Sequence, residues 1–94
     1  MKVFISGKIT GDEFSYFKFK NMEKRLLDVG YTVINPYIKP SSEWNYKQYI
    51  DMALDKLKMC DAIYSLEGWS KSKGASFERA SAELVGLKLM GAEK

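Results

Sequence analysis

GWSKSKGASFE, residues 68–78, lies between a short apolar segment and a helical pattern, and this junction decides the fold. Gly68 and Gly74 are small residues suited to a turn, and Glu78 follows about one turn into the predicted helix. Open α/β sheets bind ligands where strands end and helices begin, because backbone N–H groups point into the crevice there. The stretch therefore predicts a binding site with Glu78 as its reactive group. It is equally consistent with plain helix capping by Ser76, with Glu78 favouring the positive helix end.

Strand-like and helix-like segments alternate around this junction. Strands are predicted over residues 3–5, 31–34 and 61–66 by short runs of β-branched and aromatic residues. Helices are predicted from Asp12 or Ser15 to Gly30, over residues 46–57 and over 76–85, and residues 36–45 are predicted to form a long ordered loop. Residues 87–90 fit a fourth strand or a helix tail. The βαβαβα order predicts an α/β fold, with a three- to four-stranded parallel sheet and helices on both faces.

Composition narrows the classes of function. The 94 residues predict one domain over 1–94, and the net charge of +3 comes from scattered lysines without the basic stripe of a nucleic-acid binder. The chain has no histidine and one cysteine, Cys60, which excludes a zinc site or a histidine-based triad within one chain. We therefore expect no metal and no cofactor. The lone cysteine and the lack of a signal peptide or membrane span predict a cytoplasmic protein.

Three predicted strands end in residues suited to one shared rim. Ser6, Gly7 and Thr10 follow the first strand, Asn35 follows the second, and residues 68–74 follow the third. Turn chemistry alone also accounts for these residues. Trp69 suits either stacking on a ligand ring or packing. Lys71 and Lys73, which flank the proposed site, suit either attraction of an anionic ligand or a solvated loop.

Three aspartates are explained more simply by structural or solvent-facing roles than by catalysis. Asp61 begins the third strand and is predicted to fix the preceding turn through backbone hydrogen bonds. Asp51 and Asp55 lie four residues apart on one helix face, which favours a solvated stripe over a catalytic pair.

Several motifs together resemble a known family. FISGKITG (4–11), GYxVxNP (30–36) and CDAIY (60–64), which leads into GWxxSxGAxxExxxA (68–82), are similar to short nucleoside 2-deoxyribosyltransferase-like proteins of phages and bacteria. This resemblance covers nearly the whole chain. It implies a small flavodoxin-like three-layer sandwich, a nucleoside or nucleotide ligand, a homodimer or larger homo-oligomer, and a host cytoplasm for a phage-encoded member.

The resemblance also implies roles for particular residues. Glu78 corresponds to the nucleophile that attacks the anomeric carbon, and Ser72 corresponds to a serine that contacts phosphate. Ser6, Gly7 and Thr10 correspond to the loop that lines the sugar and base pocket. With Asn35, Trp69 and Gly74, these residues form the predicted substrate site.

One position departs from the family pattern. Active relatives carry an aspartate eight residues before the position of Asp61, where it serves base protonation or positioning, and this chain has Ala53 there. Asp51 and Asp55 lie about 200° around the helix from that position and cannot replace it. Two functions therefore stay open: a deoxyribosyltransferase or nucleotide N-hydrolase, and a binding module of the same fold.

The apolar content predicts association between copies. With 46% hydrophobic residues, the chain has more apolar surface than so small a sheet readily encloses. The stripe on the second helix, which includes Tyr49, Ile50, Ala53 and Leu57, is the predicted contributor to the contact.

Overall fold

The computed structural model describes residues 1–37 and 45–93, and most of the predicted long loop lies outside these residues. The element order follows the predicted alternation of strands and helices. The elements are β1 (Lys2–Ser6), α1 (Ser15–Val29), β2 (Thr32–Ile34), α2 (Tyr46–Leu57), β3 (Ala62–Ser65), the 3-10 helix η1 (Trp69–Lys71), α3 (Lys73–Leu84) and β4 (Lys88–Gly91). Residues 87–90, for which strand and helix tail were both open, belong mainly to the strand β4.

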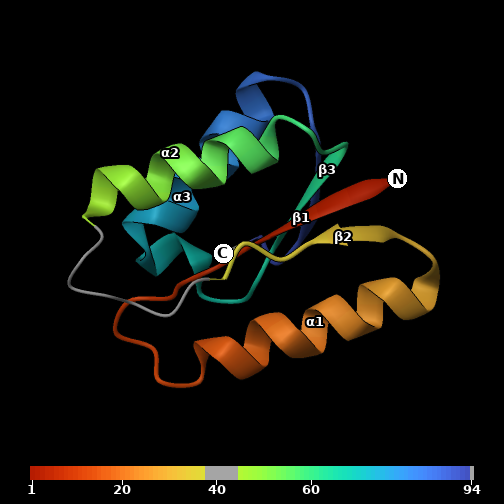
Figure 1. Cartoon of the computed structure of the whole chain (residues 1–94), viewed down its shortest axis with the longest axis horizontal. Coiled ribbons are helices and arrows are strands. Elements are labelled where there is room, and N and C mark those ends of the chain that lie inside the picture. The colour runs from red at the N-terminus through yellow and green to blue at the C-terminus, as the bar shows by residue number, and fades with distance from the viewer. Residues whose placement is uncertain (38–44, 94) are drawn as a thin grey trace.

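The four strands form one parallel sheet in the order β2-β1-β3-β4. Helix α1 covers one face of the sheet, and α2 and α3 cover the other (Figure 1). The predicted three-layer α/β sandwich is confirmed. The chain leaves β1 for β2 on one side and reaches β3 on the other, so the topological switch point lies between β1 and β3. Ligands of doubly wound sheets bind at the carboxyl ends of the strands at such a point.

Local sequence signals explain where the helices begin and end. Helix α1 ends at Gly30, whose φ of 106° lies in the left-handed region that glycine adopts without strain. Asn45 and Gln48 form a reciprocal capping box at the start of α2. The N-cap of α3 is Ser72, whose side chain accepts from the backbone N–H of Ala75. The prediction that α3 begins at Ser76 was therefore wrong by one turn.

The core divides into two clusters on opposite faces of the sheet. Successive side chains of a strand point to opposite faces, so Val3 and Ile5 join the α1-side cluster while Phe4 joins the other. Ala53 and Leu57 of α2 belong to the Phe4 cluster. The apolar stripe of α2 is thus used inside the chain, and the prediction that it mediates association was wrong.

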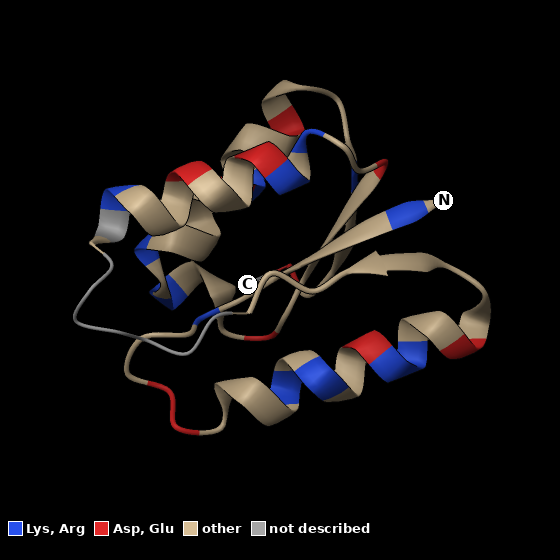
Figure 2. Cartoon of the chain, in the orientation of Figure 1, with Lys and Arg blue, Asp and Glu red and all other residues tan. Residues whose placement is uncertain are grey.

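Apolar side chains remain exposed elsewhere among the described residues. Phe14 and Phe17, at the start of α1, are each 60% exposed, and Leu84, at the end of α3, is 87% exposed. Basic and acidic side chains are interspersed along α1 and α2 (Figure 2). Phe14, Phe17 and Leu84, together with other exposed apolar residues such as Val29 and Val85, give apolar surface that a partner can cover.

Candidate functional site

Glu78 lies in the second turn of α3 and reaches the end of β1. Its side chain is almost fully enclosed, with 2% of the residue exposed. Oε1 accepts a hydrogen bond of 2.6 Å from Oγ of Ser6, the last residue of β1. Among the described residues, Oε2 is buried and accepts no hydrogen bond. Because buried polar atoms are nearly always satisfied, this oxygen points to a missing hydrogen-bond donor or to a chemical role.

Burial sets the protonation behaviour of this carboxyl group. Removal from water raises the pKa of Glu78 to about 7, and the hydrogen bond from Ser6 opposes that rise. Near neutral pH the protein therefore contains both the acid and the carboxylate. A carboxyl group poised in this way can exchange a proton or attack an electron-poor carbon.

Tyr49, which the sequence analysis did not place in the site, lies near Glu78. Tyr49 projects from α2, and burial raises its pKa above the usual range, with smaller contributions from Glu78 and Tyr37. Its phenol therefore stays protonated and can donate a hydrogen bond at neutral pH. The helical spacing of Tyr49 indicated only an apolar stripe, because a tyrosine suits a helix core as well as a site.

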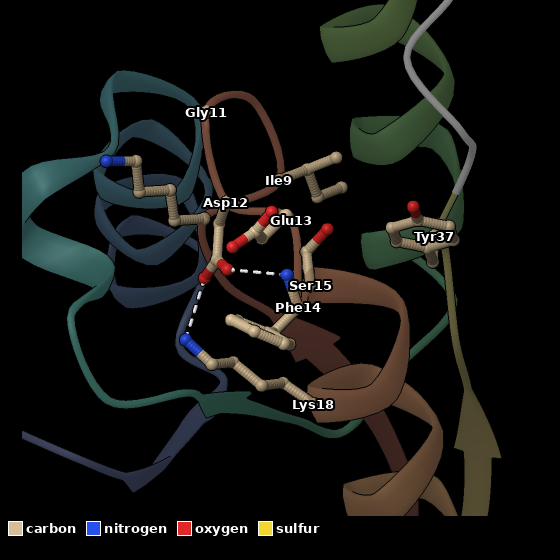
Figure 3. A pocket seen from close by; sticks show the side chains of 9 residues that line it. Ile9, Gly11, Asp12, Glu13, Phe14, Ser15, Lys18 and Tyr37 are labelled. Carbon is tan, nitrogen blue, oxygen red and sulfur yellow. Dashed lines mark hydrogen bonds and ion pairs between the residues drawn. The ribbon is translucent and has the colours of Figure 1, made fainter.

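An open pocket of about 790 Å³ lies between the β1–α1 segment and Tyr37 (Figure 3). Its walls come from Lys8, Ile9, residues 11–15 and Lys18. Asp12 and Lys18 form an ion pair of 2.7 Å at its rim. Tyr37 lines this pocket and contributes to the raised pKa of Tyr49, to which Glu78 also contributes, whereas Glu78 itself is not among the residues that line the pocket.

The predicted residues after β1 differ in their surroundings. Gly7 is buried, and a Cβ atom there would approach the Leu66 side chain to 2.8 Å, so close packing already explains this glycine. Thr10 is exposed in the loop beyond it. Only Ser6 of this group contacts Glu78 directly in the described structure.

Asn35 holds the turn after β2. Its Oδ1 accepts from the backbone N–H of Tyr37, and its Nδ2 donates to Oε1 of Glu23, both at 3.0 Å. Both ends of the amide are therefore engaged within the chain. Asn35 acts on the site by placing Tyr37.

Ser72 and Gly74 lie at the start of α3, nearly two turns and about one turn before Glu78. Oγ of Ser72 accepts from the N–H of Ala75 at 3.2 Å, and it can still donate its own proton to a ligand. The first turn of α3 contains no acidic residue, so the positive end of the helix dipole is not neutralised there.

Trp69 packs against Arg79 of the same chain. The guanidinium carbon lies 4.6 Å from the centre of the indole ring, and Nε1 donates to the carbonyl of Ala92 at 2.9 Å. Of the two interpretations of Trp69, these contacts support packing. Arg79 was not a predicted site residue, because its contacts join segments that are distant in sequence.

Asp51 and Asp55 are solvent-exposed as predicted, whereas Asp61 bonds across to β1 and not within the preceding turn. The Asp61 carboxylate accepts from the backbone N–H of Lys2 at 2.8 Å and thereby fixes the start of β3 beside β1. Asp51 and Asp55 are exposed, and Asp51 pairs with Lys47. Ala53 has no exposed surface and packs in the Phe4 cluster. Neither aspartate replaces the missing carboxylate at that position.

The site therefore centres on a buried carboxyl group at the switch point of a parallel sheet. Ser6 and Glu78 are hydrogen-bonded, Ser72 and Gly74 lie within two helical turns of Glu78, and Asn35 contributes through its turn. In the part of the chain that the structure describes, no helix is long and apolar enough to cross a membrane.

Comparisons with known proteins agree with this architecture. A solved structure of 2-deoxyribosyltransferase from the psychrotolerant bacterium Bacillus psychrosaccharolyticus superimposes with a TM-score of 0.74. The match covers 97% of this chain and 71% of that one, at 16% sequence identity, and it confirms the fold that the resemblance implied. No curated protein matches the chain. The model of a domain of unknown function, DUF4406, matches residues 1–91, and the chain is therefore a member of the DUF4406 family.

Proposed function

We propose that this protein binds a nucleoside or nucleotide and cleaves or transfers its N-glycosidic bond, with Glu78 as the nucleophile. The observation that carries the proposal is the buried Glu78 carboxyl, with Oε1 held by Ser6 and Oε2 without a partner among the described residues. Its place at the switch point is where this class of sheet binds ligands. The likeness in fold to 2-deoxyribosyltransferase supports the same chemistry.

The proposed reaction uses Oε2 of Glu78, while Oε1 stays hydrogen-bonded to Ser6. Oε2 attacks the anomeric carbon of the sugar, the carbon–nitrogen bond breaks, and its electron pair leaves with the base, which takes up a proton from solvent. Water or a second base then attacks the same carbon and releases the Glu78 carboxylate. A nearby negative charge stabilises the oxocarbenium character of both transition states. Because Oε2 is buried, substrate entry has to open a path to it, and Tyr49 is the neighbour we expect to move.

The remaining proposed contacts surround that carboxyl group. The pocket beside Tyr37, which Lys8 and Ile9 line on the β1 side, is the proposed place for the base. Gly7 and Thr10, which flank these two residues in the sequence, are proposed to contact the ligand. Gly74 is proposed to bring the backbone at the start of α3 close to the ligand, and Asn35 is proposed to support Tyr37. A contact between Trp69 and the ligand stays a prediction, although Arg79 already stacks on that ring.

A binding module without turnover is the second candidate function. Ala53 favours it, because a buried methyl group stands where active relatives carry the carboxylate that serves the leaving base. Without help for the leaving group, the carbon–nitrogen bond breaks slowly even beside a good nucleophile.

One experiment separates the two functions. The protein is incubated with a panel of deoxynucleosides and their 5′-monophosphates, free base is measured by chromatography, and thermal shifts are recorded on the same samples. Release of base supports the enzyme. A thermal shift without release supports the binding module, and neither signal across the panel contradicts both.

Replacing Ser72 tests whether the ligand carries a phosphate. Loss of the cap in Ser72→Ala should cost about 1 kcal/mol, which lowers Tm by about 4–8 °C. If Ser72 contacts a phosphate, affinity for a monophosphate should also fall about tenfold or more, with the nucleoside much less affected. Titration calorimetry measures both affinities. Ser70→Ala, an exposed serine of η1, is the matched control, and equal losses for both ligands would exclude phosphate recognition by Ser72.

We propose that copies of the chain associate through apolar side chains that are exposed in the single chain. Phe14 lines the pocket, Phe17 lies in the first turn of α1, and Leu84 is the last residue of α3. We expect light scattering at micromolar concentration to show a dimer or larger assembly. A single species near 10.8 kDa would contradict this prediction.

A further inference from the structure

Glu78 and Arg79, consecutive residues of α3, reach the ends of two neighbouring strands. Ser6 of β1 donates to Glu78 at 2.6 Å, while Nη1 of Arg79 donates to Oγ of Ser65 in β3 at 2.9 Å. Ser6 and Ser65 are direct partners in the β1–β3 register. Two consecutive residues of α3 are therefore hydrogen-bonded to two paired residues of neighbouring strands, at the switch point between β1 and β3.

The Arg79 guanidinium is held by more than its bond to Ser65. The Trp69 ring stacks on it at 4.6 Å, and Nη1 also donates to the carbonyl of Ala92 at 3.3 Å. The Trp69 indole N–H donates to that same carbonyl at 2.9 Å. A planar guanidinium can lie flat on the ring and donate in its own plane at the same time, whereas a lysine ammonium has no flat face to stack. These contacts leave the Arg79 side chain little freedom.

The segment after β4 is itself fixed on Ser65. The backbone N–H of Ala92 donates to the Ser65 carbonyl at 2.9 Å. Gly91 has a φ of +88°, and a Cβ atom there would lie 2.4 Å from the Ser65 carbonyl oxygen. Glycine is therefore required for this close approach, and the Ala92 carbonyl has a defined place beside Arg79.

We propose that Arg79 is a positioning residue, which holds Glu78 against Ser6 by tying α3 to Ser65 and to the carbonyl of Ala92. This inference rests on the proposed function, in which Glu78 is the reacting group. Arg79 acts through the placement of the helix and does not touch the reacting atoms. A displacement of about 1 Å in a reacting group can cost about 100-fold in rate, so small movements of α3 matter.

The first test needs no substrate. Carbon-13 NMR of protein labelled at the glutamate carboxyl groups reports the titration midpoint of Glu78, whose signal is assigned by its loss in Glu78→Gln. In Arg79→Ala and Ser65→Ala we expect the midpoint to move from about 7 toward 4.5, because a loosened α3 admits water to a carboxyl group whose pKa is raised mainly by burial. A weaker hydrogen bond from Ser6 acts in the opposite direction, but burial is the larger cause of the raised pKa, so the midpoint should still fall.

Controls separate positioning from general damage to the fold. Arg25→Ala removes an exposed arginine of α1 and should leave the midpoint unchanged. Circular dichroism establishes that each variant is folded. Arg79→Lys keeps the charge and N–H donors but not the planar guanidinium, so it should restore the midpoint in part. If Arg79→Ala does not fold, Ser65→Ala and Arg79→Lys make the same comparison. A midpoint that stays near 7 or rises in folded variants overturns the proposal.

The second test uses whichever substrate releases base. We expect kcat to fall about 10- to 100-fold in Arg79→Ala while KM changes less than about twofold, because positioning affects the transition state more than binding. A fall in kcat/KM that comes from KM alone contradicts a positioning role. If the wild-type protein turns over no substrate, the proposed function fails, and the NMR titration still decides whether Arg79 places Glu78.

Discussion

Glu78→Gln should abolish turnover while the protein keeps its fold and most of its affinity for the ligand. The amide occupies nearly the same volume and can still accept the hydrogen bond from Ser6, but it cannot attack the anomeric carbon. Loss of the nucleophile should lower kcat by about 1,000-fold or more. Initial rates of base release, with affinities from calorimetry, measure the two effects separately.

A matched control is available on the same helix. Glu83→Gln changes an exposed carboxylate near the end of α3 and should leave the rate of base release unchanged. If Glu78→Gln releases base at the wild-type rate, Glu78 has no part in the reaction. If the ligand instead loses its affinity in Glu78→Gln with kcat unchanged, the carboxylate serves binding alone.

The stability of the protein should fall as pH rises through neutrality, and Glu78 should account for this fall. Its pKa in the folded chain is raised from 4.5 to about 7, so the folded state binds this proton more tightly than the unfolded state does. The resulting stability is fully present below pH 4.5 and is lost as pH rises through 7. The difference amounts to on the order of 3 kcal/mol in the free energy of unfolding.

Urea unfolding at a series of pH values isolates this contribution. The difference in unfolding free energy between Glu78→Gln and the wild type should be small near pH 4.5 and should grow in favour of the variant up to about pH 8. Taking the difference between the unfolding free energies of the two proteins cancels the pH dependence that the other carboxyl groups contribute. A difference that is constant across this range would mean that Glu78 is not desolvated in solution.

The layered fold was predictable because its signals are local. Buried strands such as Val3-Phe4-Ile5 are continuous apolar runs, and Gly30 ends α1 through a conformation that other residues avoid. The start of α3 was misplaced because several serines near Gly74 can cap a helix, and only the folded loop selects Ser72. The four residues 87–90 are too few for a period to separate strand from helix.

The site was predictable only in part because its contacts are long-range. The motif around Glu78 indicated the carboxyl group, but its hydrogen bond joins residues 72 positions apart. The spacing of Tyr49 predicts a core residue and no role in the site, because the apolar side of α2 is also the side that carries Tyr49 toward Glu78. The stacking of Arg79 on Trp69 depends on η1 folding back toward α3, which residue spacing does not encode.

Trapping of the glycosyl–enzyme intermediate is the most direct test of the proposed chemistry. The protein is mixed with a deoxynucleoside that releases base, without an acceptor base, quenched in acid within one turnover and examined by mass spectrometry after peptide digestion. The account predicts a deoxyribosyl group esterified to the peptide that contains Glu78, and none in Glu78→Gln. Release of base with that peptide unmodified at every time of quenching would contradict the assignment of Glu78 as nucleophile.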